Sequence, residues 1–118
     1  MLQIKRIYDE WSKEDGFRVL VDRLWPRGVS KEEAKLGQWF KEIAPSDKLR
    51  KEFHHEDEEF KDFEKDYLKE LKENDIKEEF LSLIKEKLDL GNVTLLYAAK
   101  NETMNNAVVL KEWIEDNL

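Results

Sequence analysis

Alternating apolar and polar residues predict three β-strands. In Leu2–Tyr8 the even-numbered positions share one face, so Arg6 points the same way as the apolar side chains. Residues 17–24 and 93–99 carry apolar side chains on both faces. Strands that are apolar on both faces are typical of the centre of a sheet, so these two segments are expected to be neighbours there.

A spacing of three to four residues between apolar positions predicts helices between the second and third strands. Ser30 and Glu33 form a capping box, which opens a helix. One stripe of that helix is expected to carry Leu36, Trp39, Phe40 and Ile43. Pro45 ends it, and Ser46 caps a short helix whose apolar residues are Leu49 and Phe53.

Two longer helices follow, and a last one closes the chain. The first runs from Asp57 for about 16 residues and is expected to bury Phe60, Phe63, Tyr67 and Leu71. After a break at Asn74–Asp75, the second helix has a stripe formed by Ile76, Phe80, Leu83, Ile84 and Leu88. The last helix presents Val109, Leu110, Trp113 and Ile114 inward.

These elements predict a small layered α/β fold, with a mainly parallel sheet of about three strands flanked by helices. The 118 residues are interpreted as a single domain, 1–118, which is long enough to bury one core. Only about eight residues connect the first and second strands, which is short for a parallel crossover. The direction of the first strand relative to the second is therefore left open.

The charge is uneven along the chain. Residues 51–90 hold 15 Asp and Glu against 8 Lys, which accounts for the whole net charge of −7. Such acidic helices repel phosphates, so binding to duplex nucleic acid is disfavoured. The chain has no apolar run of membrane-spanning length, no signal-peptide pattern and no cysteine. A cytoplasmic protein without a membrane segment is expected.

Polar residues gather where the second and third strands end. If 17–24 and 93–99 are parallel neighbours, their carboxyl ends open on the same edge of the sheet, where α/β proteins bind ligands. The candidate ligand-binding residues are Arg6, Asp22, Arg23, Trp25, Arg27, Tyr97, Lys100, Asn105 and Asn106. Arginine suits phosphate or carboxylate, asparagine suits base-like edges, and tryptophan offers a stacking face. Asp22 is the candidate acid–base group, and no cofactor is indicated.

Each candidate also has a structural interpretation. The Arg and Asp residues could form an ion network, for instance Asp22 with Lys100, and Trp25 could wall the core. Asn105 and Asn106 form a good N-cap pair for the last helix. No metal site is predicted, because His54 and His55 are sequential and cannot both face one site from a regular helix.

Several long motifs resemble a known family. They are Ile4–Asp9, Gly16–Gly28, Trp39–Ser46, Leu49–Arg50 and Leu95–Lys100, followed by Asn105–Asn106–Ala107. Together they resemble the YeaO-like group of the DUF488 family, a bacterial and archaeal family defined as a domain of unknown function. The resemblance covers essentially the whole chain and implies a small cytoplasmic α/β protein, without implying a substrate or cofactor.

The resemblance also marks individual positions. The residues that coincide with its motifs are Arg6, Asp9, Arg18, Asp22, Arg23, Trp25, Arg27, Trp39, Ser46, Arg50, Tyr97, Lys100 and Asn106. In the wider family the loop after the later strand often carries cysteine and histidine. This chain has Tyr97 and then Asn105–Asn106 there, so thiol chemistry is not expected.

Two functional hypotheses follow from the sequence. The first is a protein that binds, or acts on, a small anionic or nucleotide-like ligand at the ends of strands 17–24 and 93–99. The second is a non-catalytic module that docks a protein partner through the acidic helices 57–88. A concave pocket containing the strand-end charges would favour the first, and a buried network without a cleft would favour the second.

Overall fold

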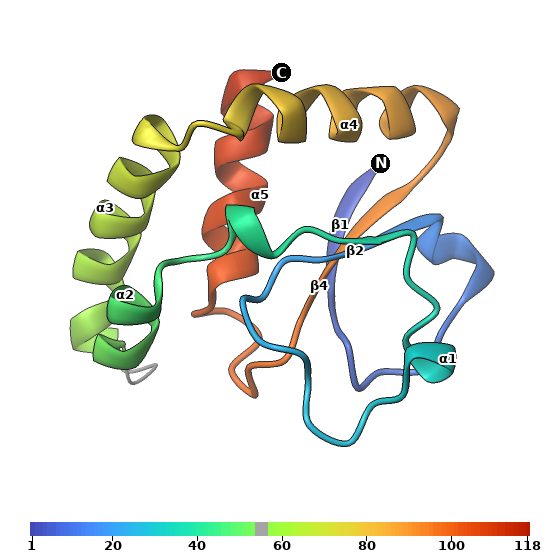
Figure 1. Ribbon diagram of the computed structural model, residues 1–118, viewed down its shortest axis with the longest axis horizontal. Coiled ribbons are helices and arrows are strands. Elements are labelled where there is room, and N and C mark those ends of the chain that lie inside the picture. Colours follow the sequence, from blue (N-terminus) through green and yellow to red (C-terminus); the bar gives the residue numbers. More distant parts are fainter. Residues whose placement is uncertain (54–56) are drawn as a thin grey trace.

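The protein is built on a sheet of four strands, all parallel, and helices flank this sheet (Figure 1). A computed structural model describes residues 1–53 and 57–118. The strands are β1 (Leu2–Arg6), β2 (Phe17–Leu20), β3 (Gln38–Trp39) and β4 (Val93–Tyr97), and they lie in the order β1-β4-β2-β3. The α/β class and the parallel sheet are confirmed, with one strand more than the sequence predicts.

β4 lies between β1 and β2, which answers the question of direction that the sequence left open. Leu2 is paired with Val93 and Phe17 is paired with the same residue from the other side, both in parallel register. The first two strands are therefore parallel to each other but not adjacent. Between them, a short 3-10 turn, η1 (Lys13–Asp15), is capped by the side chain of Ser12. Gly16 ends the turn at φ 65°, where a Cβ would lie 2.1 Å from the carbonyl oxygen of Asn92.

Both central strands are shorter than predicted. The second strand ends at Leu20 rather than Leu24, although Val21 N still donates to the carbonyl oxygen of Leu96 at 3.1 Å. One residue further on, a carboxylate oxygen of Asp22 accepts the hydrogen bond of Ala98 N at 2.9 Å. A side chain thus replaces the backbone acceptor, and the regular ladder stops there.

The predicted helix from Ser30 through Ile43 is wrong beyond its first turn. The capping box of Ser30 is present, but α1 covers only Lys31–Ala34 and ends at Lys35 with φ 47°. The chain then forms β3 and a second 3-10 turn, η2 (Lys41–Ile43). The edge of β2 decides this outcome, because Gly37 N and Phe40 N donate to carbonyl oxygens of β2. Pairing with an otherwise open strand edge overrides the local helical pattern.

The remaining helices are α2 (Asp47–Glu52), α3 (Asp57–Glu73), α4 (Lys77–Leu90) and α5 (Asn106–Asn117). Their predicted apolar stripes are largely confirmed, since Phe63, Tyr67, Leu71, Phe80, Ile84, Leu110 and Ile114 are buried. Phe60 is only partly buried. The prediction for His54 and His55 lies outside the described residues.

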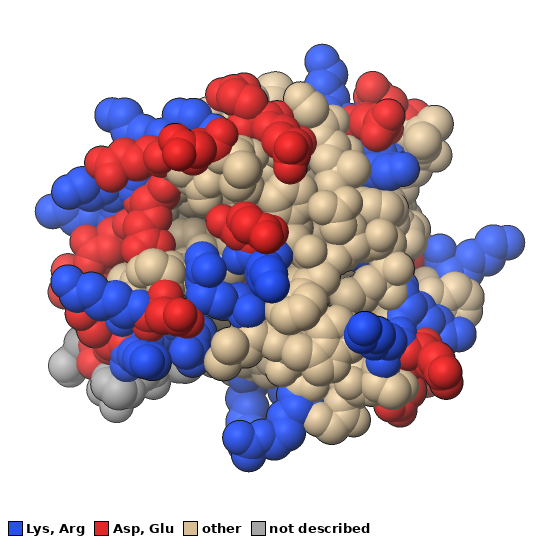
Figure 2. Space-filling view, in the orientation of Figure 1, with Lys and Arg blue, Asp and Glu red and all other residues tan. Residues whose placement is uncertain are grey.

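The sheet has two unequal faces. Val19, Leu95 and Tyr97 face the main core, which the helices α2 to α5 complete. Leu20 and Leu96 face a smaller core that is closed by Ala34 of α1 and by loops. Figure 2 shows acidic and basic side chains intermixed over α3, the outer side of the helical layer. No helix in the described part of the chain is long and apolar enough to cross a membrane.

Candidate functional site

A groove of about 430 Å³ opens at the carboxyl ends of β2 and β4. Its walls come from the loop after β2, the residues before and within α2, α3, the end of β4 and the start of α5. Five candidates from the sequence line it: Asp22, Arg23, Trp25, Arg27 and Asn106. The other four, Arg6, Tyr97, Lys100 and Asn105, are not part of its lining.

Asp22 joins the loop after β2 to two segments that lie more than 70 residues further along the chain. One of its carboxylate oxygens accepts from Ala98 N at 2.9 Å, and the other accepts from Asn106 Nδ2 at 3.1 Å. Asn106 Nδ2 also lies 3.1 Å from the carbonyl oxygen of Val21. The end of β4 and the first residue of α5 are thereby held against the loop after β2, as the parallel pairing of the two central strands requires.

Arg23 orders the opposite wall of the groove. Its Nε donates to Pro45 O at 2.9 Å and its Nη2 to Ala44 O at 3.1 Å. Because the guanidinium is planar and has five N–H donors, these two bonds fix its plane and leave further donors on a half-buried side chain. Arg23 is thus a positioning residue for the turn at Ala44–Pro45.

The same turn is held from the helical side by α3. Tyr67 Oη donates to the carbonyl oxygen of Ile43 at 2.7 Å, and Ser46 Oγ donates to a Glu70 carboxylate oxygen at 2.6 Å. Burial raises the pKa of Tyr67 well above its ordinary value of 10, and the charges of Asp22 and Glu70 add to that rise against an opposing effect of Arg23. The Tyr67 hydroxyl is therefore a neutral donor, and the wall is fixed from both sides.

Trp25 and Arg27 belong to the rim of the groove. Trp25 Nε1 donates to the carbonyl oxygen of Val29 at 2.7 Å, and its ring meets Trp39 edge-on with centroids 5.3 Å apart. Trp25 thus packs against the smaller core and also lines the groove. The side chain of Arg27 is exposed, and its backbone oxygen accepts from Tyr8 Oη at 2.8 Å.

Arg6 and Lys100 lie beside the groove. Arg6 donates through Nε to Ala99 O at 2.8 Å and through Nη2 to Ala98 O at 3.2 Å, and its guanidinium lies 5.1 Å from the ring centre of Tyr8. It therefore supports backbone that lines the groove. Lys100 is exposed, outside the lining.

Tyr97 and Asn105 are buried and have structural contacts. Tyr97 faces the main core; burial raises its pKa, as do Glu102 and Asp9, whereas Arg6 and a hydrogen bond from Asn105 oppose the rise. Asn105 is the N-cap of α5, because its Oδ1 accepts from Val108 N at 3.0 Å. The N-cap interpretation of this residue is confirmed.

Sequence reasoning missed several residues of the groove. Arg50 reaches it from α2, and Phe53 and Phe63 line it although both belong to buried helical stripes. The available signal was the pair Pro45–Ser46, which starts a short helix, combined with the family match at Arg50. Tyr8 and Leu24 also line the groove, and both are about half exposed, at 45% and 55%.

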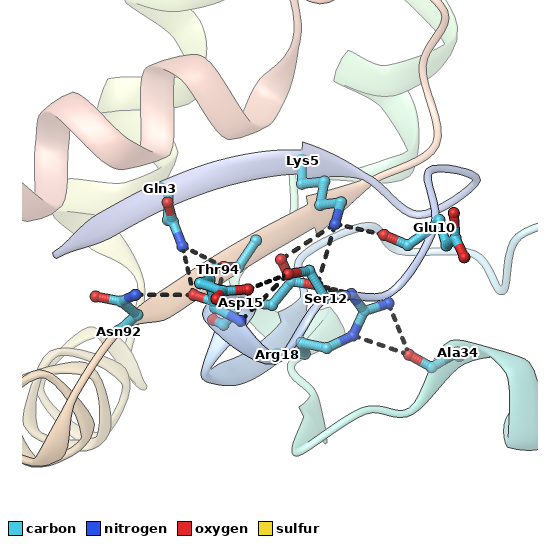
Figure 3. Close-up of polar contacts among 10 residues, drawn as sticks. Gln3, Lys5, Glu10, Ser12, Asp15, Arg18, Ala34, Asn92 and Thr94 are labelled. Carbon is cyan, nitrogen blue, oxygen red and sulfur yellow. Dashed lines mark hydrogen bonds and ion pairs between the residues drawn. The ribbon is translucent and has the colours of Figure 1, made fainter.

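A second ionic cluster lies at the amino end of β2 (Figure 3). Asp15 is bonded to Arg18 Nη1 and lies 3.1 Å from Lys5 Nζ. Arg18 also donates from Nε and Nη2 to Ala34 O at 3.2 and 2.9 Å, which closes the end of α1. Asp15 and Arg18 are 5% and 2% exposed, so this cluster is a buried ion network.

The described lining of the groove offers few groups for covalent or metal chemistry. It contains no Ser, Thr, Cys or His, and Tyr8 Oη is already donating to a carbonyl oxygen. Among the described residues, no group of three or more His, Cys, Asp and Glu is placed to hold a metal ion. What the described groove presents is a set of fixed hydrogen-bond donors and arginines beside apolar walls.

Comparison with known proteins agrees with the resemblance found in the motifs. The family model described as "Inactive DUF488-N3 subclade" matches residues 1–118. The chain is 47% identical over 113 residues to "Uncharacterized protein YeaO" of Escherichia coli K12, covering 96% of each chain. It is 34% identical over 111 residues to "Uncharacterized protein Rv3073c" of Mycobacterium tuberculosis H37Rv, covering 94% of this chain and 91% of that one. No solved structure matches with significance. The chain therefore belongs to the DUF488 family, in the subclade that this model describes.

Proposed function

We propose that the protein binds a small anionic or nucleotide-like compound in the groove at the carboxyl ends of β2 and β4. The observation that carries the proposal is the charge of the groove. Its described lining holds three arginines, Arg23, Arg27 and Arg50, against one acid, Asp22. This surplus of positive charge occurs in a chain whose net charge is −7, so it is local and favours an anion.

The three arginines have different parts in this proposal. Arg23 donates two hydrogen bonds to the carbonyl oxygens of Ala44 and Pro45 and thereby positions the wall of the groove. Arg27 and Arg50 are exposed at the rim, and the contact of Arg50 with Asp47 is long, at 3.4 Å. An exposed pair of this kind is worth about 0–1 kcal/mol. Arg50 is therefore available to a ligand, and Arg27 and Arg50 are the main anion contacts.

Binding is better supported than catalysis. Both carboxylate oxygens of Asp22 accept hydrogen bonds, which suits a residue that holds the groove together. The described lining lacks hydroxyl, thiol and imidazole nucleophiles apart from Tyr8. The family description of an inactive subclade agrees with this preference. A role of Asp22 as an acid or base remains the catalytic alternative.

The ligand hypothesis is also better supported than docking through the acidic helices 57–88. A concave pocket that contains the strand-end charges favours ligand binding over protein docking, and the groove contains Asp22, Arg23 and Arg27. A cytoplasmic location is part of the proposal, supported by the lack of cysteine.

The test is a thermal-shift screen with nucleotides, sugar phosphates and carboxylates. A ligand present at about 100 times its dissociation constant adds about 2.7 kcal/mol to stability, so tight binding raises the unfolding temperature by several degrees. We expect hits on the wild type and on Lys85→Ala, which removes an exposed charge from α4 outside the groove. The combined variant Arg27→Ala/Arg50→Ala should lose them. The proposal fails if no compound stabilises the wild type, or if the combined variant keeps every hit.

A further inference from the structure

The groove combines its arginines with apolar side chains. Leu24, Trp25, Phe53 and Phe63 line it together with two prolines. Leu24 is 55% exposed, one of the few large apolar side chains that the described part of the chain leaves open to water. Exposed apolar surface gathered beside charges is typical of a binding site rather than of ordinary surface. A small anion without an apolar group would make no contact with these apolar side chains.

The aromatic side chains at the end of α2 and in α3 lie deeper in the groove than two of its arginines. Phe53 and Phe63 are 7% and 4% exposed, and their rings are stacked with centroids 4.2 Å apart. They form the inner wall, whereas the Arg27 and Arg50 side chains are exposed at the rim. A ligand that fits both parts has its anionic group outward and its apolar group inward.

The inner polar groups disfavour a second anionic group on the ligand. Asp22 is the acid of the described lining, and it would repel an anionic group placed deep in the groove. The inner arginine, Arg23, already donates to two carbonyl oxygens. The volume of about 430 Å³ lies toward the lower end of the range of about 300–1,000 Å³ for small-molecule sites. These features favour a compact ligand over an extended polyphosphate.

We infer that the ligand is a compact aromatic compound with a single anionic group, either a carboxylate or a phosphate monoester. Its ring lies against Leu24, Phe53 and Phe63, and its anionic group meets Arg27 and Arg50. Aromatic and aliphatic walls of this kind suit a flat ring. This inference rests on the proposed function, and it adds the ring and the orientation.

The test is a titration of isotope-labelled protein followed by NMR, because simple probes bind weakly. The probes are benzoate, phenyl phosphate, benzamide, acetate and inorganic phosphate. We expect benzoate or phenyl phosphate, or both, to shift the amide resonances of Ala98, Ala99 and Asn106. Benzamide and acetate should each bind at least about tenfold more weakly than benzoate, because benzamide lacks the charge and acetate lacks the ring. Inorganic phosphate lacks the ring as well, and it should bind at least about tenfold more weakly than phenyl phosphate.

The outcomes separate this inference from the proposed function. If acetate or inorganic phosphate binds as tightly as its aromatic counterpart, the inference is wrong and anion binding stands. If benzamide binds as tightly as benzoate, both are wrong, because charge does not matter. If none of the probes binds but the thermal-shift screen yields a non-aromatic anion, only the inference is overturned. If neither experiment yields an anion, the proposed function fails.

A matched pair of variants tests the orientation. Leu24→Asn should lower the affinity for the aromatic probe that binds the wild type more tightly by about tenfold, because the ring of the probe loses an apolar contact. Leu68→Asn is the control, since Leu68 is 38% exposed on α3 and lies outside the groove. Arg50→Gln should lower the affinity for aromatic anions and for simple anions alike. Equal affinity of Leu24→Asn and Leu68→Asn for the aromatic probe would show that the ring does not lie where we place it.

Discussion

β2 has an aspartate and an arginine near each of its ends, and the two ends behave differently. At the amino end, Asp15 and Arg18 bond directly to each other and are almost fully buried. At the carboxyl end, Asp22 bonds to Ala98 N and Asn106, and Arg23 bonds to the carbonyl oxygens of another loop. Those two residues are half-buried and line the groove.

The difference shows what decides between a structural ion pair and a candidate binding site. The same residue types occur at both ends of one strand, so composition does not distinguish them. At the amino end Asp15 bonds to Arg18 and to Lys5, and the backbone N–H of Ser12 also donates to it (Figure 3). At the carboxyl end each charged side chain bonds to a different segment of the chain, and the groove lies between these segments.

The largest expected effect comes from breaking the buried pair. Arg18→Met should lower the free energy of unfolding by about 3–5 kcal/mol, because it leaves the Asp15 carboxylate buried with one partner fewer and frees Ala34 O. Urea denaturation monitored by tryptophan fluorescence measures the change. Lys111→Met is the control, since Lys111 pairs with Glu115 on the surface, and it should cost less than about 1 kcal/mol. A loss below 1 kcal/mol for Arg18→Met would mean that the network is not structural.

A second effect is the pH dependence of the same network. Burial raises the pKa of Asp15, but hydrogen bonds from Ser12 N, Lys5 and Arg18 together outweigh it and lower the pKa below its ordinary value of 3.8. A lowered pKa in the folded state means that the carboxylate stabilises the fold above pH 3.8, and that this contribution is lost as the pH falls through the lower folded value.

Comparing the wild type with Asp15→Asn isolates this contribution from that of other acids. We expect the stability gap between them to be constant near neutral pH and to shrink progressively below about pH 4. Urea denaturation of both proteins from pH 3 to 7 provides the measurement. A gap that stays constant down to pH 3 would contradict the assignment of this carboxylate to the network.

A smaller loss is expected at the other end of β2. Arg23→Ala removes two hydrogen bonds from a charged donor, but the side chain is half-buried, so we expect a loss of about 1–2 kcal/mol. Urea denaturation of Arg23→Ala and Arg18→Met under the same conditions compares the loss of unfolding free energy at the two ends of β2. Arg23→Lys should recover only part of the loss, because an ammonium cannot reproduce the fork that holds two carbonyl oxygens. A loss as large as that of Arg18→Met would make the two ends equivalent.

The smallest effect on stability is expected at the rim. Arg27→Ala should change the free energy of unfolding by less than about 0.5 kcal/mol, because the side chain is exposed. The same variant should lower the affinity for any anion found in the thermal-shift screen. Stability is read from urea denaturation and affinity from the ligand titration. If Arg27→Ala unfolds markedly more easily, Arg27 supports the loop rather than a ligand.

Much of the fold could be predicted because local signals and tertiary contacts agree. The apolar residues on both faces of 17–24 and 93–99 indicated central strands, and these are β2 and β4. The serine caps also matched, since Ser30 and Ser46 both accept a bond from the backbone three residues on. Where the signals disagreed, prediction failed, and the helix expected after Ser30 gave way to the edge of β2.

The candidate site could be located only in part. Asp22 and Asn106 were both expected at the strand ends, and they bond to each other. Lys100 directly follows the predicted strand 93–99, but β4 ends at Tyr97 and Lys100 lies outside the lining of the groove, because position along the chain does not determine direction beyond the strand. Arg50 and Phe53 could not be placed from periodicity, since their approach depends on how α2 packs across the end of the sheet.

The position of β4 in the middle of the sheet has a consequence for how the protein is made. β1 is synthesised before the other three strands, but its partner in the sheet is β4, and Leu2 pairs with Val93. β2 and β3 can meet early, whereas β1 must wait until β4 has left the ribosome. The groove depends on the same late event, because Ala98 and Asn106 follow β4. Contacts between such distant segments are slow to form, so the groove should be among the last parts of the molecule to exist in each newly made copy.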